Sequence, residues 1–397
     1  MKPTIVLDAA PFCYGPISTL LSIVDHLPHD ELDLVLLASG TAAEFAAPYA
    51  DRFRIVPCNT EEVSELEHHR GLIERSRLFI SNTNPAGARF AAMCGTPTIY
   101  VDTLFWMWDE IDPVVAGSTL LYVAQDFDGI EENYRRLGGA IEDFRVVGPL
   151  INTSVRHRSS AENSCVISFG GMESSLTKPG ETNNYPWLMT EILLAAFSRS
   201  ARFDRHLFRG RGPVMEQLAL EHEDVTVDFR FVPHERYLEE IGGCRLHLLS
   251  PGLTGAYEAA ALNVPTVLLL PQNYSQQLQA ETFLANPGWR FAGYQWSDIY
   301  PDVEMRRYMP EAEAIAMLND VIRRFESDTV AHRRYADMLD DAIERTLCRE
   351  AGGTAMRSGA GEVAAMVVDV LAERHAPAAR PAFPLPLSPI AAMGQSL

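Results

Sequence analysis

The sequence predicts an α/β protein with two doubly wound, Rossmann-like domains that face each other across a cleft. Three observations predict this fold class. Short β-branched runs alternate with helical patterns along the first half of the chain, which is typical of parallel strands with helices on both sheet faces. The same alternation begins again after a polar stretch at 151–163. The length of 397 residues fits two such domains.

The first half contains the elements of one complete domain. Pro16 stands at the start of its first helical pattern, where proline is favoured. The predicted strands lie at 3–10, 31–38, 53–57, 78–81, 98–101 and 144–150. The predicted helices lie at 16–27, 42–50, 61–76 and 85–93. We therefore expect an N-terminal domain over 1–150.

The second half repeats the pattern. Its predicted strands lie at 165–169, 206–208, 225–231, 246–249 and 266–270, and its helices at 187–198, 237–241, 254–262 and 275–284. We expect a C-terminal domain over 164–330. Helices follow over 331–375, and packing back on the first domain is one arrangement open to them. Residues 376–397 are rich in Pro and Ala and predict a flexible tail.

Composition excludes several classes of function. The chain has 33 Lys and Arg against 53 Asp and Glu, a net charge of −20, so its average field repels nucleic acids and anionic membranes. No apolar run reaches the ~18 residues of a transmembrane helix. The six cysteines form no C-x-x-C pair, which favours reduced thiols in a cytoplasmic protein over disulfides or a zinc site.

Ligands of open parallel sheets bind beyond the carboxyl ends of the strands, so the loops after the strands are the candidate sites. The loop that follows Asp8 leads through Cys13, Tyr14 and Gly15 into a helix. The free amides of that helix start favour an anion or a hydroxyl acceptor, although a plain turn explains the same residues. A second loop begins with Gly170 and Gly171, which allow a backbone to approach a ligand closely.

The strongest candidate site begins at Ser250. Small residues, Gly252 to Gly255, open an Ala-rich helix after an apolar strand. Their amides and the helix dipole suit a diphosphate. Glu258 lies about one turn into that helix, where its carboxylate can accept hydrogen bonds from both hydroxyls of a ribose. A solvent-facing glutamate is the alternative, and the absence of other charges beside it favours the ribose.

A fourth segment follows the next strand. It contains four Gln and one Asn within eight residues, among them Gln272, Gln276 and Gln277. Amides both donate and accept hydrogen bonds, which suits the hydroxyls of a sugar. The start of a surface helix would have a similar composition. The position directly after a strand, next to the diphosphate site, favours sugar binding.

These last two segments, SPGLTGAYEAAALNVPTVLLLPQNYSQQLQAE, resemble the donor-binding region of GT-B fold glycosyltransferases. The likeness is to the peptidoglycan N-acetylglucosaminyltransferase and its antibiotic-glycosylating and plant relatives, and it is specific over 245–281. It implies that Gly170, Gly171 and Ser250 lie at the donor and that Gln272, Gln276 and Gln277 lie near the transferred sugar. It further implies that Val232 binds the base through its main chain, that Glu258 holds the ribose, and that the diphosphate lies on Gly252, Leu253, Thr254 and Gly255.

The same resemblance places the acceptor at the N-terminal loop, with Tyr14 and Gly15, and here the sequence departs from the family. Many relatives carry a histidine base in this loop, where this chain has Cys13 or Tyr14. A hydroxyl acceptor needs a base of near-neutral pKa, for which Asp8, Asp102 and Asp109 are candidates. Residues 104–108, with Phe105 and Trp106, line an apolar acceptor pocket or belong to the ordinary core.

The predicted activity is the metal-independent, inverting transfer of a sugar from a UDP- or TDP-sugar to a small-molecule acceptor. No D-x-D motif follows any of the strands predicted above, so we expect no metal, and we expect no cofactor besides the donor itself. The missing histidine supports an alternative, a catalytically inactive GT-B protein that binds a partner. A nucleotide-sugar hydrolase or epimerase on the same fold is a third candidate.

Overall fold

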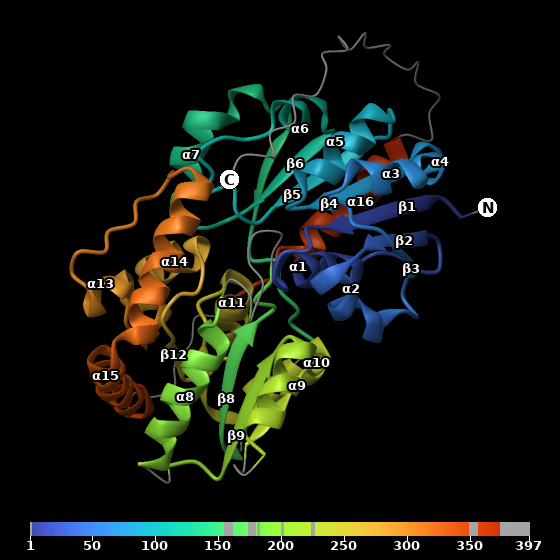
Figure 1. Ribbon diagram of the computed structural model, residues 1–397. Coiled ribbons are helices and arrows are strands. Elements are labelled where there is room, and N and C mark those ends of the chain that lie inside the picture. Colours follow the sequence, from blue (N-terminus) through green and yellow to red (C-terminus); the bar gives the residue numbers. More distant parts are fainter. Residues whose placement is uncertain are drawn as a thin grey trace.

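Two separate parallel sheets organise the chain (Figure 1). The computed structural model describes residues 2–154, 162–173, 180, 183–199, 202–223, 227–348 and 356–373. The expected tail at 376–397 lies outside the described residues. None of the helices in the described part is long and apolar enough to cross a bilayer.

The first sheet has seven parallel strands in the order β3-β2-β1-β4-β5-β6-β7. The strand order reverses between β1 and β4, and this point forms the crevice in which such sheets bind ligands. The strands are β1 (Thr4–Ala9), β2 (Asp33–Ala38), β3 (Arg54–Pro57), β4 (Leu78–Asn82), β5 (Thr98–Asp102), β6 (Leu121–Gln125) and β7 (Phe144–Val147).

Helices cover both faces of this sheet because alternate strand residues point to opposite sides. Leu7 of β1 packs in one core with α1, α2 and α16, whereas the neighbouring Val6 packs with α3, α4 and α5 on the other face. The bounds are α1 (Gly15–Val24), α2 (Gly40–Ala46), α3 (Val63–His68), α4 (Arg70–Arg75), α5 (Pro85–Met93), α6 (Pro113–Ser118), α7 (Ile130–Leu137) and α16 (Ala360–Glu373).

The second sheet repeats the arrangement with six parallel strands in the order β10-β9-β8-β11-β12-β13. Its strand order reverses between β8 and β11. The strands are β8 (Glu162–Gly170), β9 (Arg205–Gly210), β10 (Asp228–Arg230), β11 (Cys244–Leu249), β12 (Thr266–Leu268) and β13 (Ala292–Gly293). The helices are α8 (Tyr185–Ser198), α9 (Gly212–Glu221), α10 (His234–Gly243), α11 (Leu253–Ala261), α12 (Tyr274–Ala285), α13 (Trp296–Ile299), α14 (Glu311–Ser327) and α15 (Thr329–Leu347).

The last helix returns to the first domain. The Gly359 amide donates to the Pro149 carbonyl over 2.8 Å, and the Ser358 hydroxyl donates to the Ile151 carbonyl over 2.7 Å. Val363 and Val367 of α16 are fully buried in the core that α1 also lines. Within the range 331–375, α15 therefore packs on the second sheet and α16 on the first (Figure 1).

Some elements differ from the sequence prediction. Strand β6 and helix α7 were not predicted, although Leu121–Gln125 is a buried run of suitable length. The D-x-D sequence Asp126-Phe127-Asp128 follows β6 directly, so the expectation that no such motif stands at a strand end was wrong. Asp128 pairs there with Arg307 over 2.8 Å. The single helix predicted over 61–76 is two helices, α3 and α4, that meet at His69. Gly71 is a poor helix former and weakens a continuous helix there.

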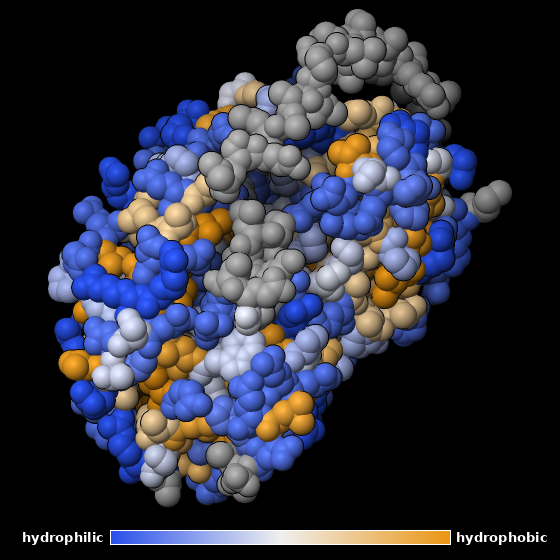
Figure 2. Space-filling model, in the orientation of Figure 1, coloured by the Kyte–Doolittle hydropathy of each residue, from blue (hydrophilic) through white to orange (hydrophobic). Residues whose placement is uncertain are grey.

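Aromatic rings join the two domains behind the cleft. Trp106 and Phe127 of the first domain have ring centroids 4.5 Å apart, and Phe127 lies 5.5 Å from Phe283 of the second. The Tyr257 hydroxyl donates to the Asp126 carbonyl across the same boundary over 2.7 Å. By contrast, the outer face in Figure 2 is mostly hydrophilic, with apolar side chains scattered among polar ones.

Candidate functional site

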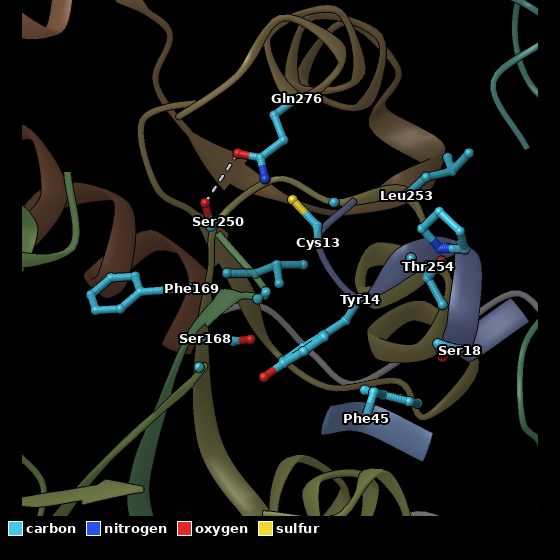
Figure 3. Close-up of a pocket in the computed structure, with 18 of the residues that line it drawn as sticks. Cys13, Tyr14, Ser18, Phe45, Ser168, Phe169, Ser250, Leu253, Thr254 and Gln276 are labelled. Carbon is cyan, nitrogen blue, oxygen red and sulfur yellow. Dashed lines mark hydrogen bonds between the residues drawn. The ribbon is translucent and has the colours of Figure 1, made fainter. Parts of the chain in front are cut away.

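A cavity lies between the carboxyl ends of the two sheets and is lined by both domains (Figure 3). The loops that follow β1, β5, β8, β10, β11 and β12 and the end of β9 all reach it, so both points of strand reversal open into one space. Thirteen residues singled out in the sequence line this cavity: Cys13, Tyr14, Gly15, Gly170, Gly171, Val232, Ser250, Gly252, Leu253, Thr254, Gly255, Glu258 and Gln276. The cavity wall does not include Asp8, Asp102, Phe105, Trp106, Gln272 or Gln277.

The start of α11 presents free amides to the cavity. Its N-cap residue, Gly252, has no side chain with which to accept from them, and no side-chain capping bond is formed. The first amides of a helix have no acceptor within the helix, and the helix dipole adds about half a positive charge at this end. The start of α11 can therefore bind an anionic group such as a diphosphate.

Helix α1 begins opposite α11. Its N-cap residue, Tyr14, also makes no side-chain capping bond. A Cβ atom added to Gly15 would lie 3.8 Å from the Thr254 hydroxyl, so the two helix starts almost touch. Two positive helix ends repel each other unless an anion lies beside both. The facing arrangement therefore strengthens the preference of the cavity for negative charge.

The loop between β1 and α1 docks against the second domain backbone to backbone. The Cys13 amide donates to the Glu173 carbonyl over 2.7 Å. A Cβ atom added to Gly171 would lie 2.4 Å from the carbonyl carbon of Cys13, so only glycine permits this approach. Cys13 itself has a φ of 49°, a left-handed conformation that the close docking maintains.

Glu258 is buried and paired with a histidine. Its side chain is 2% exposed, and its Oε1 atom lies 2.8 Å from Nε2 of His234. Burial alone would lower the pKa of His234, but the Glu258 carboxylate, together with the more distant Asp25 and Glu235, raises it overall. The alternative in which Glu258 faces solvent is therefore wrong. A buried carboxylate beside the α11 amides is a strong acceptor for hydroxyl groups.

A polar network fixes the side chain of Gln276. Its Oε1 atom accepts hydrogen bonds from the Ser250 hydroxyl and from the backbone amide of Gln272, both over 3.1 Å. Gln272 in turn donates to the Ser250 hydroxyl over 2.9 Å and to the Phe169 carbonyl over 2.8 Å. With the oxygen of Gln276 held on this side, its amide nitrogen is turned toward the cavity (Figure 3).

Gln272 and Gln277 lie behind the cavity wall. Gln272 acts through Gln276 and Ser250, as the network shows. Gln277 donates to Glu281 over 2.8 Å and to the Gln295 side chain over 3.4 Å. Of the three glutamines predicted to contact the sugar, the structure therefore brings only Gln276 to the cavity.

None of the three carboxylates considered as bases lies in the cavity wall: Asp8 and Asp102 are fully buried, and Asp109 is half-buried. Asp102 accepts from the Tyr122 hydroxyl over 2.6 Å, from the Leu104 amide over 2.8 Å and from the Trp108 indole over 3.1 Å. These bonds hold the loop after β5 in place. Asp8 accepts from the Asn84 amide over 2.7 Å on the face that α5 covers. Its other oxygen has no partner among the described residues.

We expect Asp8 to make stability depend on pH. Burial raises the pKa of its carboxyl to about 7, above the value in the unfolded chain, so the folded state binds the proton more tightly. Stability should therefore fall as pH rises from about 4 to about 7 and then level off. Asp8→Asn should remove this slope and raise the unfolding free energy above pH 7 by a few kcal/mol, measured by urea unfolding between pH 5 and 9.

Asp204→Asn is the matched control for this experiment, because Asp204 is exposed. This control should retain the wild-type slope. If Asp8→Asn also retained the wild-type pH dependence of stability, the Asp8 carboxyl would have the same pKa in the folded and unfolded chains, and the prediction would be wrong.

Cys13 and Tyr14 line the cavity, but neither resembles the missing histidine base. Burial raises the pKa of the Cys13 thiol to about 12, so it stays protonated at neutral pH. The pKa of Tyr14 is raised still further, first by burial and then by the nearby Glu44 carboxylate. The Tyr14 ring packs against Phe45 and Phe231, with centroids 5.1 and 6.0 Å away. The Tyr14 ring therefore lies beside the segment around Val232 that is expected to hold the nucleobase.

Phe105 and Trp106 belong to the core. Both side chains are fully buried, and neither reaches the cavity. The interpretation as ordinary core therefore fits both aromatic residues. Of the segment 104–108, only Leu104 lines the cavity, next to Thr103.

Among the cavity residues that the sequence prediction did not single out are Phe45, Phe231, His234 and Gln279. Phe231 and His234 lie on either side of Val232, which was predicted to bind through its main chain. The sequence therefore located this segment but not the two side chains that it adds to the cavity wall. Gln279 lies one turn beyond Gln276 on α12. Phe45 comes from α2, in the other domain, and no pattern in the sequence connects it to this site.

The comparisons with known proteins support the fold. No protein-family profile matches the sequence, and no curated protein matches it. Among solved structures, Arabidopsis thaliana UGT89C1 complexed with UDP is 12% identical, covers 92% of this chain and 99% of its own, and has a TM-score of 0.52. The glycosyltransferase of kitacinnamycin is 15% identical, with coverage of 94% and 100% and a TM-score of 0.50. A UDP-glucosyltransferase from Polygonum tinctorium is 12% identical, with coverage of 94% and 99% and a TM-score of 0.50.

These similarities cover nearly the whole chain at low identity, so they concern the fold alone. Both domains, the reversal of strand order in each sheet and the cavity between them agree with the resemblance stated above. The predicted fold class is confirmed: the chain has the GT-B architecture of these glycosyltransferases.

Proposed function

We propose that the protein transfers a sugar from a UDP- or TDP-sugar to a small-molecule acceptor, with inversion at the anomeric carbon. One observation carries the proposal: the uncapped start of α11 and the buried carboxylate of Glu258 lie in one cavity between two GT-B domains. Similar structures support it, since one is described with UDP and another as a UDP-glucosyltransferase.

The donor would lie along the second domain. The α11 amides would hold the diphosphate, Glu258 would accept from the ribose, and the main chain at Val232 would meet the edge of the base. The amide nitrogen of Gln276 would donate to a hydroxyl of the transferred sugar. All of these groups line the same cavity, so one extended ligand can contact them together.

The proposed reaction is a single displacement. A bond forms from the acceptor to the anomeric carbon while the bond from that carbon to the diphosphate oxygen breaks. The electron pair leaves with the diphosphate, and the acceptor gives up its proton to a base or to water. The α11 amides face the developing charge without rearranging, so the proposal includes neither a metal nor a cofactor. An amine or thiol acceptor would need less help from a base than a hydroxyl.

A second candidate is a nucleotide-sugar-binding protein without transfer activity. Within the described part of the cavity wall, the only carboxylate is Glu258, and it is paired with His234. The Cys13 thiol is a poor base at neutral pH. The described residues therefore supply the donor site more completely than they supply a base for the acceptor.

Product analysis separates the candidates. The protein would be incubated with UDP- and TDP-sugars, with and without a panel of phenol, alcohol, amine and thiol acceptors, and the products identified by mass spectrometry. We expect a glycosylated acceptor and free UDP or TDP. Nucleotide binding without product would support the inactive binding protein, and sugar released without any acceptor would support a hydrolase.

A further inference from the structure

Two aromatic rings of the first domain reach the nucleotide side of the cavity. Tyr14 stands at the start of α1 and Phe45 on α2. The Tyr14 ring lies 6.0 Å from Phe231, and the Phe45 ring lies 5.3 Å from His234, both in the second domain. Tyr14 and Phe45 also contact each other, with centroids 5.1 Å apart. The four rings form one cluster that spans the domain boundary, and all four line the cavity.

Both first-domain rings are held in place by contacts to the second domain. The residue before Tyr14 is fixed by the backbone bond from Cys13 to Glu173 and by its close docking on Gly171. The residue before Phe45 is Glu44, whose carboxylate accepts from the Gly212 amide at the start of α9 over 2.7 Å. These rings therefore have fixed positions before a ligand binds, so binding there costs less conformational entropy.

The cluster lies beside the groups proposed to hold a nucleoside. Phe231 precedes Val232, whose main chain would meet the base. His234 is paired with Glu258, which would accept from the ribose, over 2.8 Å. A base attached to that ribose would lie among the rings, and flat aromatic bases stack favourably on aromatic side chains.

We propose that Tyr14 and Phe45 form the first-domain wall of the nucleobase site, so that both domains hold the nucleoside of the donor. The inference rests on the proposed function and goes beyond it, because it makes Tyr14 a residue of the donor site and not of the acceptor site. It also makes nucleotide binding depend on contact between the two domains.

Calorimetry with UDP, TDP and inorganic pyrophosphate tests this inference. Tyr14→Leu and Phe45→Leu keep an apolar side chain but remove the ring, and each should weaken UDP and TDP binding about tenfold. Tyr14→Phe keeps the ring and should bind both nucleotides within twofold of the wild type. Pyrophosphate has no base, so its affinity should be the same in all of these variants. Tyr134→Leu, which removes an exposed ring far from the cavity, is the matched control.

The outcomes separate this inference from the proposed function. If the wild type bound neither UDP nor TDP, the proposed function would fail. If the wild type bound them and the two Leu variants bound them equally well or more tightly, only the inference would be overturned. An equal loss of pyrophosphate binding would also overturn it, because the rings would then support the cavity as a whole and not the base.

Discussion

Glu258→Gln is expected to weaken UDP binding about 100-fold, measured by calorimetry at pH 7. The carboxylate is 2% exposed and lies beside the start of α11. Hydrogen bonds to a charged group contribute about 1.5–3 kcal/mol each, and the ribose offers two hydroxyls to a single carboxylate. Glutamine replaces one accepting oxygen with a donor and removes the charge, so about 3 kcal/mol of binding free energy should be lost.

Glu239→Gln is the matched control, because Glu239 lies on the neighbouring helix α10 and is 42% exposed. It should bind UDP as the wild type does. The Glu258 variant must also be shown to be folded, because removing the carboxylate leaves His234 buried without its partner. The raised pKa of His234 should then fall. Unchanged UDP affinity in a folded Glu258→Gln variant would disprove the ribose assignment.

Trp106→Ala is expected to lower the free energy of unfolding by about 3–5 kcal/mol, measured by urea unfolding. This is the usual cost of removing a fully buried aromatic side chain. Trp106 has no exposed surface, and its ring lies 4.5 Å from Phe127, which continues to Phe283 in the second domain. The loss should therefore weaken the packing between domains as well as the core.

Leu220→Ala is the comparison for this variant, because Leu220 is 70% exposed and should lose little stability. A second measurement is the acceptor KM of whatever transfer activity is found. A Trp106→Ala protein of normal stability with a raised acceptor KM would contradict the core assignment and return Trp106 to the acceptor pocket.

The layout of the fold follows from local patterns. Strands such as Thr4–Ala9 and Cys244–Leu249 are buried, apolar and bounded by turn residues, so periodicity locates them. Strand β13 has two residues and gives too short a signal to predict. Strand β6 does give a signal, a buried run of five residues, and the prediction failed to use it.

The donor side of the site was predictable for a related reason. Ser250, Gly252, Gly255, Glu258 and Gln276 lie within one strand–helix–strand–helix unit, so their spacing in sequence translates directly into proximity. Asp8 and Asp102 were expected near the ligand because each stands at a strand end. The elements that pack around these two residues set the direction in which their side chains point. No local sequence pattern predicts that direction.

The sequence by itself determined two parallel α/β domains and a Gly-rich helix start with an acidic residue one turn along. These features depend on neighbours in the chain, whose spacing is fixed by helix and strand geometry. Only the tertiary structure decided that His234 pairs with Glu258, that Gly171 receives Cys13, and that Phe45 joins the cavity. Those contacts join residues far apart in the chain, and they exist because the packing of two domains brings their strand ends face to face.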